Sequence, residues 1–543
     1  MNGGWPESCG KKSKDSHITD KKEEFMNLGR YVSRSAKYYP DHIAIMFEGK
    51  QISYKELDKR TNRLAQGLYA LGLKKGDRVA IQSWNRPEIA ETEVACYKAG
   101  MVRIPINARL SAAEATGILN NAEVKALIGD KPHLESLMDN QNSLETVQHF
   151  INVDGPSGGT IFYDPLLSEN RDESPDIEVE MDELAVLTYS SGTTGKLKGI
   201  MQSYGNRMAM IRKALMFPEV RIKPGDKIVH VGPITHVSGM LLMPFFFTGG
   251  CNLILNRFDL DILLDTIQRE KVNYTMVVPA MINFVLAYPK ARQYKFDSLK
   301  GIFYGAAPIS PTRVQQAIDL FGPILIQGYG MSETTSFIAV LTASEHTEAL
   351  KNNPDRLGSC GRPVFDTEIR VVNERGEQVA PGEVGEITAR GPDIMKGYYK
   401  DPELTQKTII NNWIYSGDMA KVDEEGYIYI VDRKTEMIIT GGFNVYPSEI
   451  EQVLYRHPSV MEACAIGVPD EKWGEAIKAV VVLKKGCTAT EEEIINHCKE
   501  LLSGYKKPQS VDFVKELPKN PNGKIARRSV KEIYWAGKAR RVN

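Results

Sequence analysis

The feature that most constrains the fold is a glycine- and hydroxyl-rich segment that directly follows an apolar run. Residues 184–187 are all apolar, and residues 188–199 hold six hydroxyl-bearing side chains, three glycines and two lysines. The apolar run predicts a buried strand, and the glycines let the backbone after it turn and approach a ligand closely. Hydroxyls that donate hydrogen bonds and lysines that carry positive charge suit a triphosphate. We therefore expect a strand that ends in a phosphate-binding loop.

Two other interpretations of this segment are a Walker A loop and a flexible linker. A Walker A loop needs a glycine five residues before the Gly195–Lys196 pair and a Ser or Thr after it. Ser190 and Leu197 occupy those positions, so the spacing excludes that loop. A flexible linker is the common fate of a Gly/Ser/Thr cluster. The order of the residues disfavours a linker, and motifs further along the chain support the phosphate loop.

Strand-like and helical patterns alternate along the chain. Strands are predicted at 42–47, 78–82, 102–106, 126–128, 184–187, 227–231, 275–279 and 301–305, and helices after residue 25, from 52 to about 73 and from 88 to 99. The apolar run 237–255 contains Pro244 and the Gly249–Gly250 pair, which favour a buried helix, a turn and a strand over a membrane span. This alternation predicts an α/β fold with largely parallel sheets.

The chain of 543 residues is long enough for two or more domains. Short strands split by Gly-rich turns predict a β-rich subdomain over 358–431, and about a hundred residues with their own βα alternation follow. We predict a large N-terminal domain of α/β subdomains plus this β-rich subdomain, and a small mobile α+β C-terminal domain. The predicted boundaries are a disordered tail at 1–24, the large domain at 25–432 and the small domain at 433–543.

Charge and cysteine usage exclude several function classes. Lys and Arg number 68 against 69 Asp and Glu, so the basic excess of a nucleic-acid binder is missing. Seven scattered cysteines form no CxxC pair, and no histidine spacing indicates zinc. The N-terminus lacks the apolar core of a signal peptide. We predict a cytoplasmic protein with reduced cysteines, no membrane span and no nucleic-acid partner; a homodimer is left open.

Four more stretches carry candidate chemistry. In 327–335, Tyr329 lies between glycines and offers a flat face for a purine, and the Glu333 carboxylate suits Mg²⁺. Asp418 follows a tight glycine turn, and Arg433 lies just after a predicted strand. In 436–451, Ser448 and Glu451 after Pro447 predict a helix-capping box. Lys524 follows an Asn/Gly turn. Taken singly, each fits an ordinary turn, loop cap, surface ion pair or solvated lysine equally well.

In this order, the stretches 188–199, 327–335, 413–418, 436–451 and 518–527 resemble the motifs of the adenylate-forming superfamily. Its members include acyl- and aryl-CoA synthetases, peptide-synthetase adenylation domains and firefly-type luciferases. The resemblance covers nearly the whole chain after the N-terminal tail. Ser332 replaces the usual Thr but keeps the hydroxyl, and Thr435 stands where the family hinge is commonly Asp or Lys. The region 25–432 would then be the adenylation domain.

The resemblance implies ATP, Mg²⁺ and coenzyme A as cofactors. ATP or AMP would be bound by Thr188, Ser190, Ser191, Gly192, Thr193, Thr194, Gly195, Lys196, Gly305, Ala306, Ala307, Gln327, Gly328, Tyr329, Ser332, Asp418, Arg433 and Lys524. Mg²⁺ would be held by Glu333 and Thr193, and Asp418 would hold the ribose. Lys524 would be catalytic, because a cation aimed at the α-phosphate offsets repulsion between carboxylate and triphosphate.

The resemblance also places the acid and CoA. The acid pocket would be formed by His236, Gly239, Met240, Gly305, Gly330 and Met331, with His236 also catalytic; a buried structural His236 is the alternative. CoA would meet Gly441, Gly442 and Arg257, although a plain surface arginine is an equal interpretation of Arg257. The segment 231–247 lacks the Asp that binds an amino acid's ammonium. A fatty acid is the first choice and an aryl acid the second.

Three other activities are alternatives to CoA ligation. A stand-alone adenylating enzyme would load a separate carrier protein in place of CoA. A luciferase-like oxygenase would emit light, and a non-catalytic nucleotide-binding scaffold would release no AMP. The joint presence of Glu333, Asp418 and Lys524 argues against the scaffold.

Overall fold

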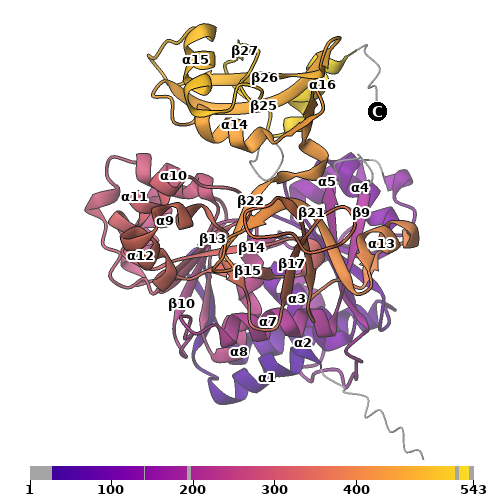
Figure 1. Cartoon of the computed structure of the whole chain (residues 1–543). Helices are drawn as coiled ribbons and strands as arrows, with labels where there is room; N and C mark the ends of the chain where they lie inside the picture. Colours follow the sequence, from indigo (N-terminus) through magenta and orange to yellow (C-terminus); the bar gives the residue numbers. More distant parts are fainter. Residues whose placement is uncertain (1–26, 140, 192–196, 520–524, 537–543) are drawn as a thin grey trace, which may run out of the picture.

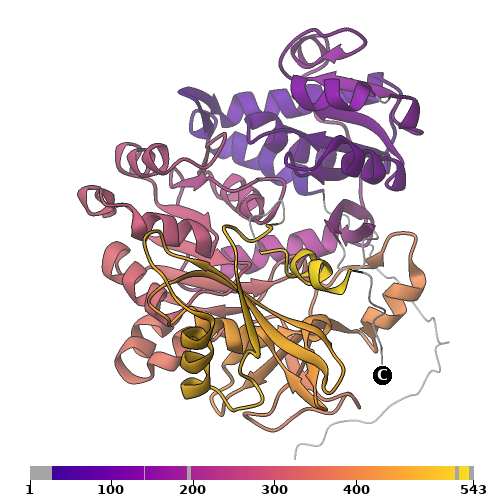
Figure 2. The same ribbon diagram turned by 90° about the horizontal axis from the view of Figure 1, so that it is seen from above.

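The computed structural model describes residues 27–139, 141–191, 197–519 and 525–536, with Ser190 and Ser191 described by their backbone alone. The predicted tail at 1–24, the loop residues 192–196 and Lys524 lie outside the described residues. Figures 1 and 2 show the C-terminal part of the chain, in yellow, set against one side of the larger N-terminal part.

Two large sheets form the centre of the N-terminal part. The first runs in the order β19-β9-β8-β4-β3-β5-β6-β7 and the second in the order β16-β15-β14-β13-β12-β10-β11-β1-β2. Their strands are β1 (Ile43–Phe47), β2 (Lys50–Ser53), β3 (Arg78–Gln82), β4 (Val102–Ile106), β5 (Val124–Gly129), β6 (His149–Asn152), β7 (Ile161–Phe162), β8 (Leu184–Ser191), β9 (Leu197–Ser203), β10 (Lys227–His230), β11 (Cys251–Ile254), β12 (Tyr274–Val277), β13 (Gly301–Gly305), β14 (Leu325–Gly330), β15 (Phe337–Leu341), β16 (Arg362–Pro363) and β19 (Gly397–Tyr398). Pairing is parallel through β8-β4-β3-β5-β6-β7 and through β1-β11-β10-β12-β13-β14.

Helices connect these strands and cover the sheets. They are α1 (Leu28–Tyr38), α2 (Tyr54–Ala70), α3 (Pro87–Ala99), α4 (Ala112–Asn121), α5 (Lys131–Met138), α6 (Tyr163–Ser168), α7 (Tyr204–Met216), α8 (Leu242–Thr248), α9 (Leu260–Arg269), α10 (Pro279–Ala287), α11 (Pro311–Phe321) and α12 (Ala343–Asn352), with short 3-10 turns η2 (Val237–Leu241) and η4 (Ser332–Thr334). Helix α3 is buried almost all round, as expected of a helix packed between two sheets.

Two smaller sheets complete the molecule. A β-rich part combines β17 (Glu368–Val372), β18 (Gly385–Arg390), β20 (Ile409–Ile410), β21 (Trp413–Val422) and β22 (Ile428–Arg433), with α13 (Pro402–Thr408). The C-terminal part combines β23 (Ile438–Thr440), β24 (Phe443–Val445), β25 (Val460–Asp470), β26 (Gly474–Leu483) and β27 (Ser510–Phe513) with α14 (Pro447–Leu454), α15 (Glu491–Leu501) and α16 (Arg527–Trp535). The predicted α/β class, the β-rich subdomain and the smaller C-terminal domain are confirmed.

Local sequence signals explain many element ends. The Ser53 side chain accepts a hydrogen bond from the Glu56 backbone N–H at the start of α2. The capping box predicted for α14 is wrong: Tyr446 is the N-cap residue, and no side-chain cap is formed. Asp432 instead accepts a hydrogen bond from the Ser448 N–H at 2.8 Å, and Glu451 forms an ion pair with Arg527. Ser448 and Glu451 thus bind residues outside the helix and do not form the predicted capping box.

The segments 155–183 and 237–255 both contain helix and strand. The run 237–255 forms η2, α8, a turn and β11, as predicted. Residues 155–183 contain β7 and α6, and the Tyr163 ring is buried. Among the described residues, no helix is long and apolar enough to cross a membrane.

A buried ion pair joins the first sheet's helices to the β-rich part. Lys213 on α7 donates hydrogen bonds to Asp393 and to the Thr367 hydroxyl, each at 2.6 Å. Asp393 is fully buried. The pair therefore ties two parts of the chain that are 180 residues apart in sequence.

Candidate active site

The predicted nucleotide-binding segments meet where strands of the two large sheets end. Gly305 at the end of β13 is paired with Gly328 of β14. A Cβ atom at Gly305 would lie 2.2 Å from the Gly328 carbonyl oxygen, and one at Gly328 would lie 2.5 Å from the Phe337 ring. Only glycine fits at these two positions, so bare backbone forms this part of the surface.

The backbone just beyond each of these strands is strained. Ala306 has a φ of +66° and Thr335 a φ of +56°, values that side-chain-bearing residues rarely adopt. The Thr188 and Thr335 hydroxyl oxygens are buried without a hydrogen-bond partner among the described residues. Strained residues and unpaired buried polar atoms concentrate where a ligand completes the structure.

Glu333 is positioned by a residue that the sequence analysis missed. The Tyr398 hydroxyl donates a hydrogen bond to Glu333 Oε1 at 3.0 Å. Burial, and then the Glu333 charge, raise the pKa of Tyr398, so its proton stays in place. Tyr398 lies on β19, which pairs with β9 directly after the loop 192–196. Gln202 of β9 also donates a hydrogen bond to the Ser332 carbonyl at 3.1 Å. The structure thus brings Glu333 to the edge of the predicted phosphate loop.

The Glu333 carboxylate is a suitable ligand for Mg²⁺. Tyr398 occupies Glu333 Oε1, so Oε2 remains to bind a cation, and carboxylate oxygen is the donor that Mg²⁺ prefers. No group of three or more His, Cys, Asp or Glu side chains within 27–139, 141–191, 197–519 and 525–536 could hold a metal. Mg²⁺ is commonly bound by one or two carboxylates together with substrate phosphates, so Glu333 would be its ligand from the described residues.

Asp418, Tyr329 and Arg433 form a connected group. The Tyr329 hydroxyl donates to Asp418 Oδ2 at 2.7 Å, and Arg433 Nε lies 2.9 Å from Asp418 Oδ1. Burial, and then Asp418, raise the pKa of Tyr329 far above its usual value. Arg433 is half-exposed while Asp418 is buried. Each carboxylate oxygen keeps a second lone pair, so Asp418 can still accept hydrogen bonds from two hydroxyls of a ligand.

Gln327 lies on β14 before Tyr329 and contacts the buried Tyr304, which in turn contacts His346. Tyr304 Oη lies 3.1 Å from the Gln327 amide and 2.8 Å from His346 Nε2. Tyr304 and His346 are fully buried, whereas Gln327 is only partly buried. Tyr304 and His346 were not predicted, because nothing in their local sequence distinguishes them from core residues.

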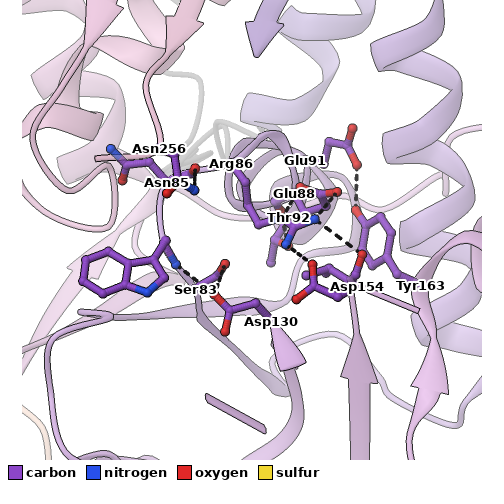
Figure 3. Close-up of polar contacts among 12 residues, drawn as sticks. Ser83, Asn85, Arg86, Glu88, Glu91, Thr92, Asp130, Asp154, Tyr163 and Asn256 are labelled. Atoms are coloured by element: carbon purple, nitrogen blue, oxygen red, sulfur yellow. Dashed lines mark hydrogen bonds and ion pairs between the residues drawn. The ribbon is translucent and has the colours of Figure 1, made fainter. Parts of the chain in front are cut away.

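The segment expected to bind the acid is held by Asn85, another residue that the sequence analysis missed. Its side chain accepts a hydrogen bond from the Ile234 N–H at 2.9 Å and donates to the carbonyls of Gly232 and Leu255 at 2.8 and 3.1 Å. Figure 3 shows Asn85 beside Asn256, whose amide donates to the Asn85 carbonyl at 3.2 Å. Asn85 thereby fixes the loop that leads to His236.

His236 itself is exposed, which argues against a core histidine at this position. The nearby His230 is the buried histidine of this region, and it contacts the Ser238 carbonyl at 2.9 Å and Asn252 at 2.8 Å. A Cβ atom at Gly239 would lie 2.0 Å from the Ile234 carbonyl oxygen, and one at Gly330 would lie 2.2 Å from the Ser336 carbonyl oxygen. The remaining pocket residues, Met240 and Met331, are partly buried.

The residues assigned to CoA contact other parts of the chain. The Arg257 guanidinium lies over the Trp84 ring, 4.1 Å from its centroid. The Gly441 N–H donates to the Trp473 carbonyl at 2.9 Å, and Gly442 has a φ of +82° with open space beside it. Their role toward CoA stays a prediction.

Arg527 anchors the chain just after the undescribed residues 520–524. Its guanidinium contacts Glu451 at 2.8 Å, Asp432 at 3.4 Å and Glu436. Asp432 belongs to β22 of the β-rich part, and Glu451 to α14 of the C-terminal part. Arg527 therefore joins both sides of the predicted domain boundary in this arrangement.

Comparison with known proteins assigns the family. The sequence model of the family of AMP-binding enzymes matches residues 32–399. The sequence model of the AMP-binding enzyme C-terminal domain matches residues 449–524. A feruloyl-CoA synthase of Amycolatopsis sp is 36% identical over 93% of this chain and 99% of its own length. A medium/long-chain-fatty-acid–CoA ligase of Mycobacterium tuberculosis is 33% identical over 95% of this chain and 91% of its own.

Solved structures agree with this assignment. ATP-bound MatB from Rhodopseudomonas palustris superposes with a TM-score of 0.85 at 30% identity, covering 94% of this chain and 99% of that one. The o-succinylbenzoate CoA synthetase of Bacillus subtilis, in complex with its acyl-adenylate, has a TM-score of 0.82 at 30% identity, covering 92% of this chain and 97% of that one. The chain belongs to the AMP-binding enzyme family and is an AMP-forming acid–thiol ligase.

Proposed function

We propose that the chain activates an aromatic carboxylic acid with ATP and transfers the acyl group to CoA. The observation that carries this proposal is the set of similar proteins, which includes feruloyl-CoA synthases at 36% identity and an indoleacetate–CoA ligase of Aromatoleum aromaticum at 31%. A fatty-acid ligase is also similar, at 33%. The sequence favoured a fatty acid as the substrate, with an aryl acid second. The similar proteins favour an aryl acid first and a fatty acid second.

The geometry of the acid-binding segments is compatible with a flat substrate. A Cβ atom at Gly239, Gly305 or Gly330 would clash with a backbone carbonyl oxygen, at 2.0, 2.2 and 2.2 Å, so these positions accept only glycine. A planar ring can lie against a bare peptide surface of this kind. An exposed His236 at the same segment offers a polar contact.

The proposed reaction has two steps. The acid's carboxylate attacks the α-phosphorus of ATP, forming an acyl-AMP mixed anhydride and releasing pyrophosphate. The CoA thiol then loses its proton and its sulfur attacks the acyl carbonyl, giving the thioester and AMP. Asp418 and Arg433 would hold the ribose side of the nucleotide, and Tyr329 would fix the Asp418 carboxylate.

Mg²⁺ would neutralise phosphate charge, and Glu333 would hold it. Thr193 and Lys524, the other residues expected at the phosphates, lie outside the described residues. Rotation of the C-terminal domain about the region of Thr435, a homodimer and a cytoplasmic location stay predictions.

The experiment is an AMP-release assay with ATP and CoA across two matched acid series. The aromatic series is ferulate, indole-3-acetate and 2-succinylbenzoate, and the aliphatic series is octanoate, decanoate and hexadecanoate. We expect the best aromatic acid to exceed every aliphatic acid in kcat/KM by about tenfold or more. A higher kcat/KM for any aliphatic acid would overturn the proposal. A phosphopantetheinylated carrier protein in place of CoA tests the carrier-loading alternative.

A further inference from the structure

The peptide groups on both sides of Glu333 are held by hydrogen bonds. The Ser332 carbonyl belongs to the same planar peptide as the Glu333 N–H, and it accepts hydrogen bonds from Gln202 Nε2 and from the Thr335 N–H, each at 3.1 Å. The Glu333 carbonyl accepts a hydrogen bond from the Met395 N–H at 2.9 Å. Thr335 has a φ of +56°, and such strain persists only where surrounding contacts over-determine the backbone. The place of Glu333 therefore depends on these contacts.

The Gln202 contact bridges the two large sheets. Gln202 is a buried residue of β9 in the first sheet, and Ser332 directly follows the end of β14 in the second. A carbonyl only accepts, so the nitrogen of the Gln202 amide faces Ser332. The amide oxygen then faces Arg207 Nη1, which lies 3.4 Å away and can only donate. One orientation of the amide therefore satisfies both of its neighbours.

Arg207 is itself fixed by buried partners. Its Nη2 donates to Glu93 Oε1 and its Nε to the Tyr97 hydroxyl oxygen, both at 2.9 Å. Glu93 also forms an ion pair with Arg103 of β4 at 2.9 Å. The charged side chains of Arg207, Glu93 and Arg103 are all buried. Because Arg207 donates from each of its three nitrogens to a buried partner, its guanidinium presents Nη1 to Gln202 in one direction.

We propose that Gln202 and Arg207 are positioning residues for the metal ligand of the ligase reaction. Arg207 orients the Gln202 amide, and this amide fixes the peptide that precedes Glu333. Tyr398 holds the carboxylate end of the Glu333 side chain, whereas Gln202 holds its backbone end. Without the Gln202 amide the peptide can turn and carry the carboxylate away from the cation. This inference rests on the proposed role of Glu333 toward Mg²⁺.

Three variants test the inference. Gln202→Leu removes both amide contacts. Gln202→Glu keeps an oxygen for Arg207 but places a second oxygen against the Ser332 carbonyl. Arg207→Lys keeps the buried charge but loses the planar fork that reaches three partners.

AMP release is measured against free Mg²⁺ at saturating ATP, and Mn²⁺ binding to the protein–ATP complex by electron paramagnetic resonance. In all three variants the half-saturating metal concentration should rise about tenfold or more in both measurements. KM for the acid and for CoA should stay at the wild-type values. An unchanged metal requirement in either Gln202 variant, or in Arg207→Lys, would overturn the inference.

A double-mutant cycle separates positioning from a general loss of stability. If Gln202 acts through the Glu333 carboxylate, Gln202→Leu should add nothing to the metal requirement of Glu333→Gln. Effects that multiply would reject the inference. Asn27→Leu is the matched control, because the buried Asn27 amide donates to the Ile177 carbonyl at the same 3.1 Å distance. It should keep the wild-type metal requirement, and a shift equal to that of Gln202→Leu would also reject the inference.

The outcomes also distinguish this inference from the proposed function. A preference for aliphatic acids would reject the aromatic substrate class and leave the metal measurements as expected. Wild-type protein whose ATP complex binds no Mn²⁺ would reject the metal site, and the inference with it. Normal Mn²⁺ binding by wild-type protein and by Gln202→Leu would reject only the roles of Gln202 and Arg207.

Discussion

Removal of the Tyr398 hydroxyl should weaken the use of Mg²⁺ without unfolding the protein. Tyr398 donates one hydrogen bond to the Glu333 carboxylate at 3.0 Å. Hydrogen bonds to charged groups contribute about 1.5–3 kcal/mol. Glu333 is partly exposed, so we take the lower end, which corresponds to about a tenfold effect. Loss of a group that orients a metal ligand typically costs about 10–100-fold in metal affinity or activity, which agrees with this value.

The assay measures AMP release by Tyr398→Phe against free Mg²⁺ at saturating ATP, and Mn²⁺ binding to the ATP complex by electron paramagnetic resonance. The half-saturating metal concentration should rise about tenfold in both measurements. Tyr429→Phe is the control, because its hydroxyl contacts the Asp423 carboxylate at the same 3.0 Å distance. The reasoning is refuted if Tyr398→Phe needs no more metal than wild-type protein, or if Tyr429→Phe shifts equally.

Three further predictions concern stability. Lys213→Met leaves the fully buried Asp393 without its cation. The free energy of unfolding, measured by urea titration, should therefore fall by about 3–5 kcal/mol. A loss below about 1 kcal/mol would contradict this prediction. Gly361 has a φ of +86°, and a Cβ atom there would lie 2.0 Å from the Val340 carbonyl. We therefore expect Gly361→Ala to lower Tm clearly. An unchanged Tm would count against the described backbone. The pKa of His346 is lowered from 6.5 to about 4, so the unfolded chain binds the extra proton between these values. The free energy of unfolding should therefore fall by roughly 3 kcal/mol as pH drops through that window. His346→Gln should lack this contribution, and identical pH profiles for the two proteins would reject it.

Sequence patterns predicted those strands and helix ends that depend only on neighbouring residues. The strands at 78–82 and 102–106 are found at those residues, because period and residue type determine a buried parallel strand. The Ser53 cap likewise depends on residues three positions apart. The capping box at Ser448 failed because Asp432 and Arg527, distant in sequence, compete for the same groups.

The candidate site was predicted in part, by resemblance. The resemblance named Tyr329 and Asp418, which are hydrogen-bonded to each other, and Glu333, which follows Tyr329 by four residues. It missed Tyr398 and Asn85, whose partners lie 65 and 147–170 residues away in sequence. A lone Tyr or Asn in a sequence gives no sign of such a distant partner. Only the packed structure shows that these residues hold the site's side chains and loops.

The pairing of β1 has a consequence for synthesis on the ribosome. β1 and β2 are made early, yet β1 joins its sheet through β11, with Ile45 opposite Asn252. At about 5–20 residues per second, the intervening stretch of about 200 residues takes roughly 10–40 s to translate. During that interval one edge of the nascent hairpin lacks its native neighbour and exposes unpaired backbone groups. The β1–β2 hairpin therefore needs protection from pairing with other chains while the polypeptide emerges.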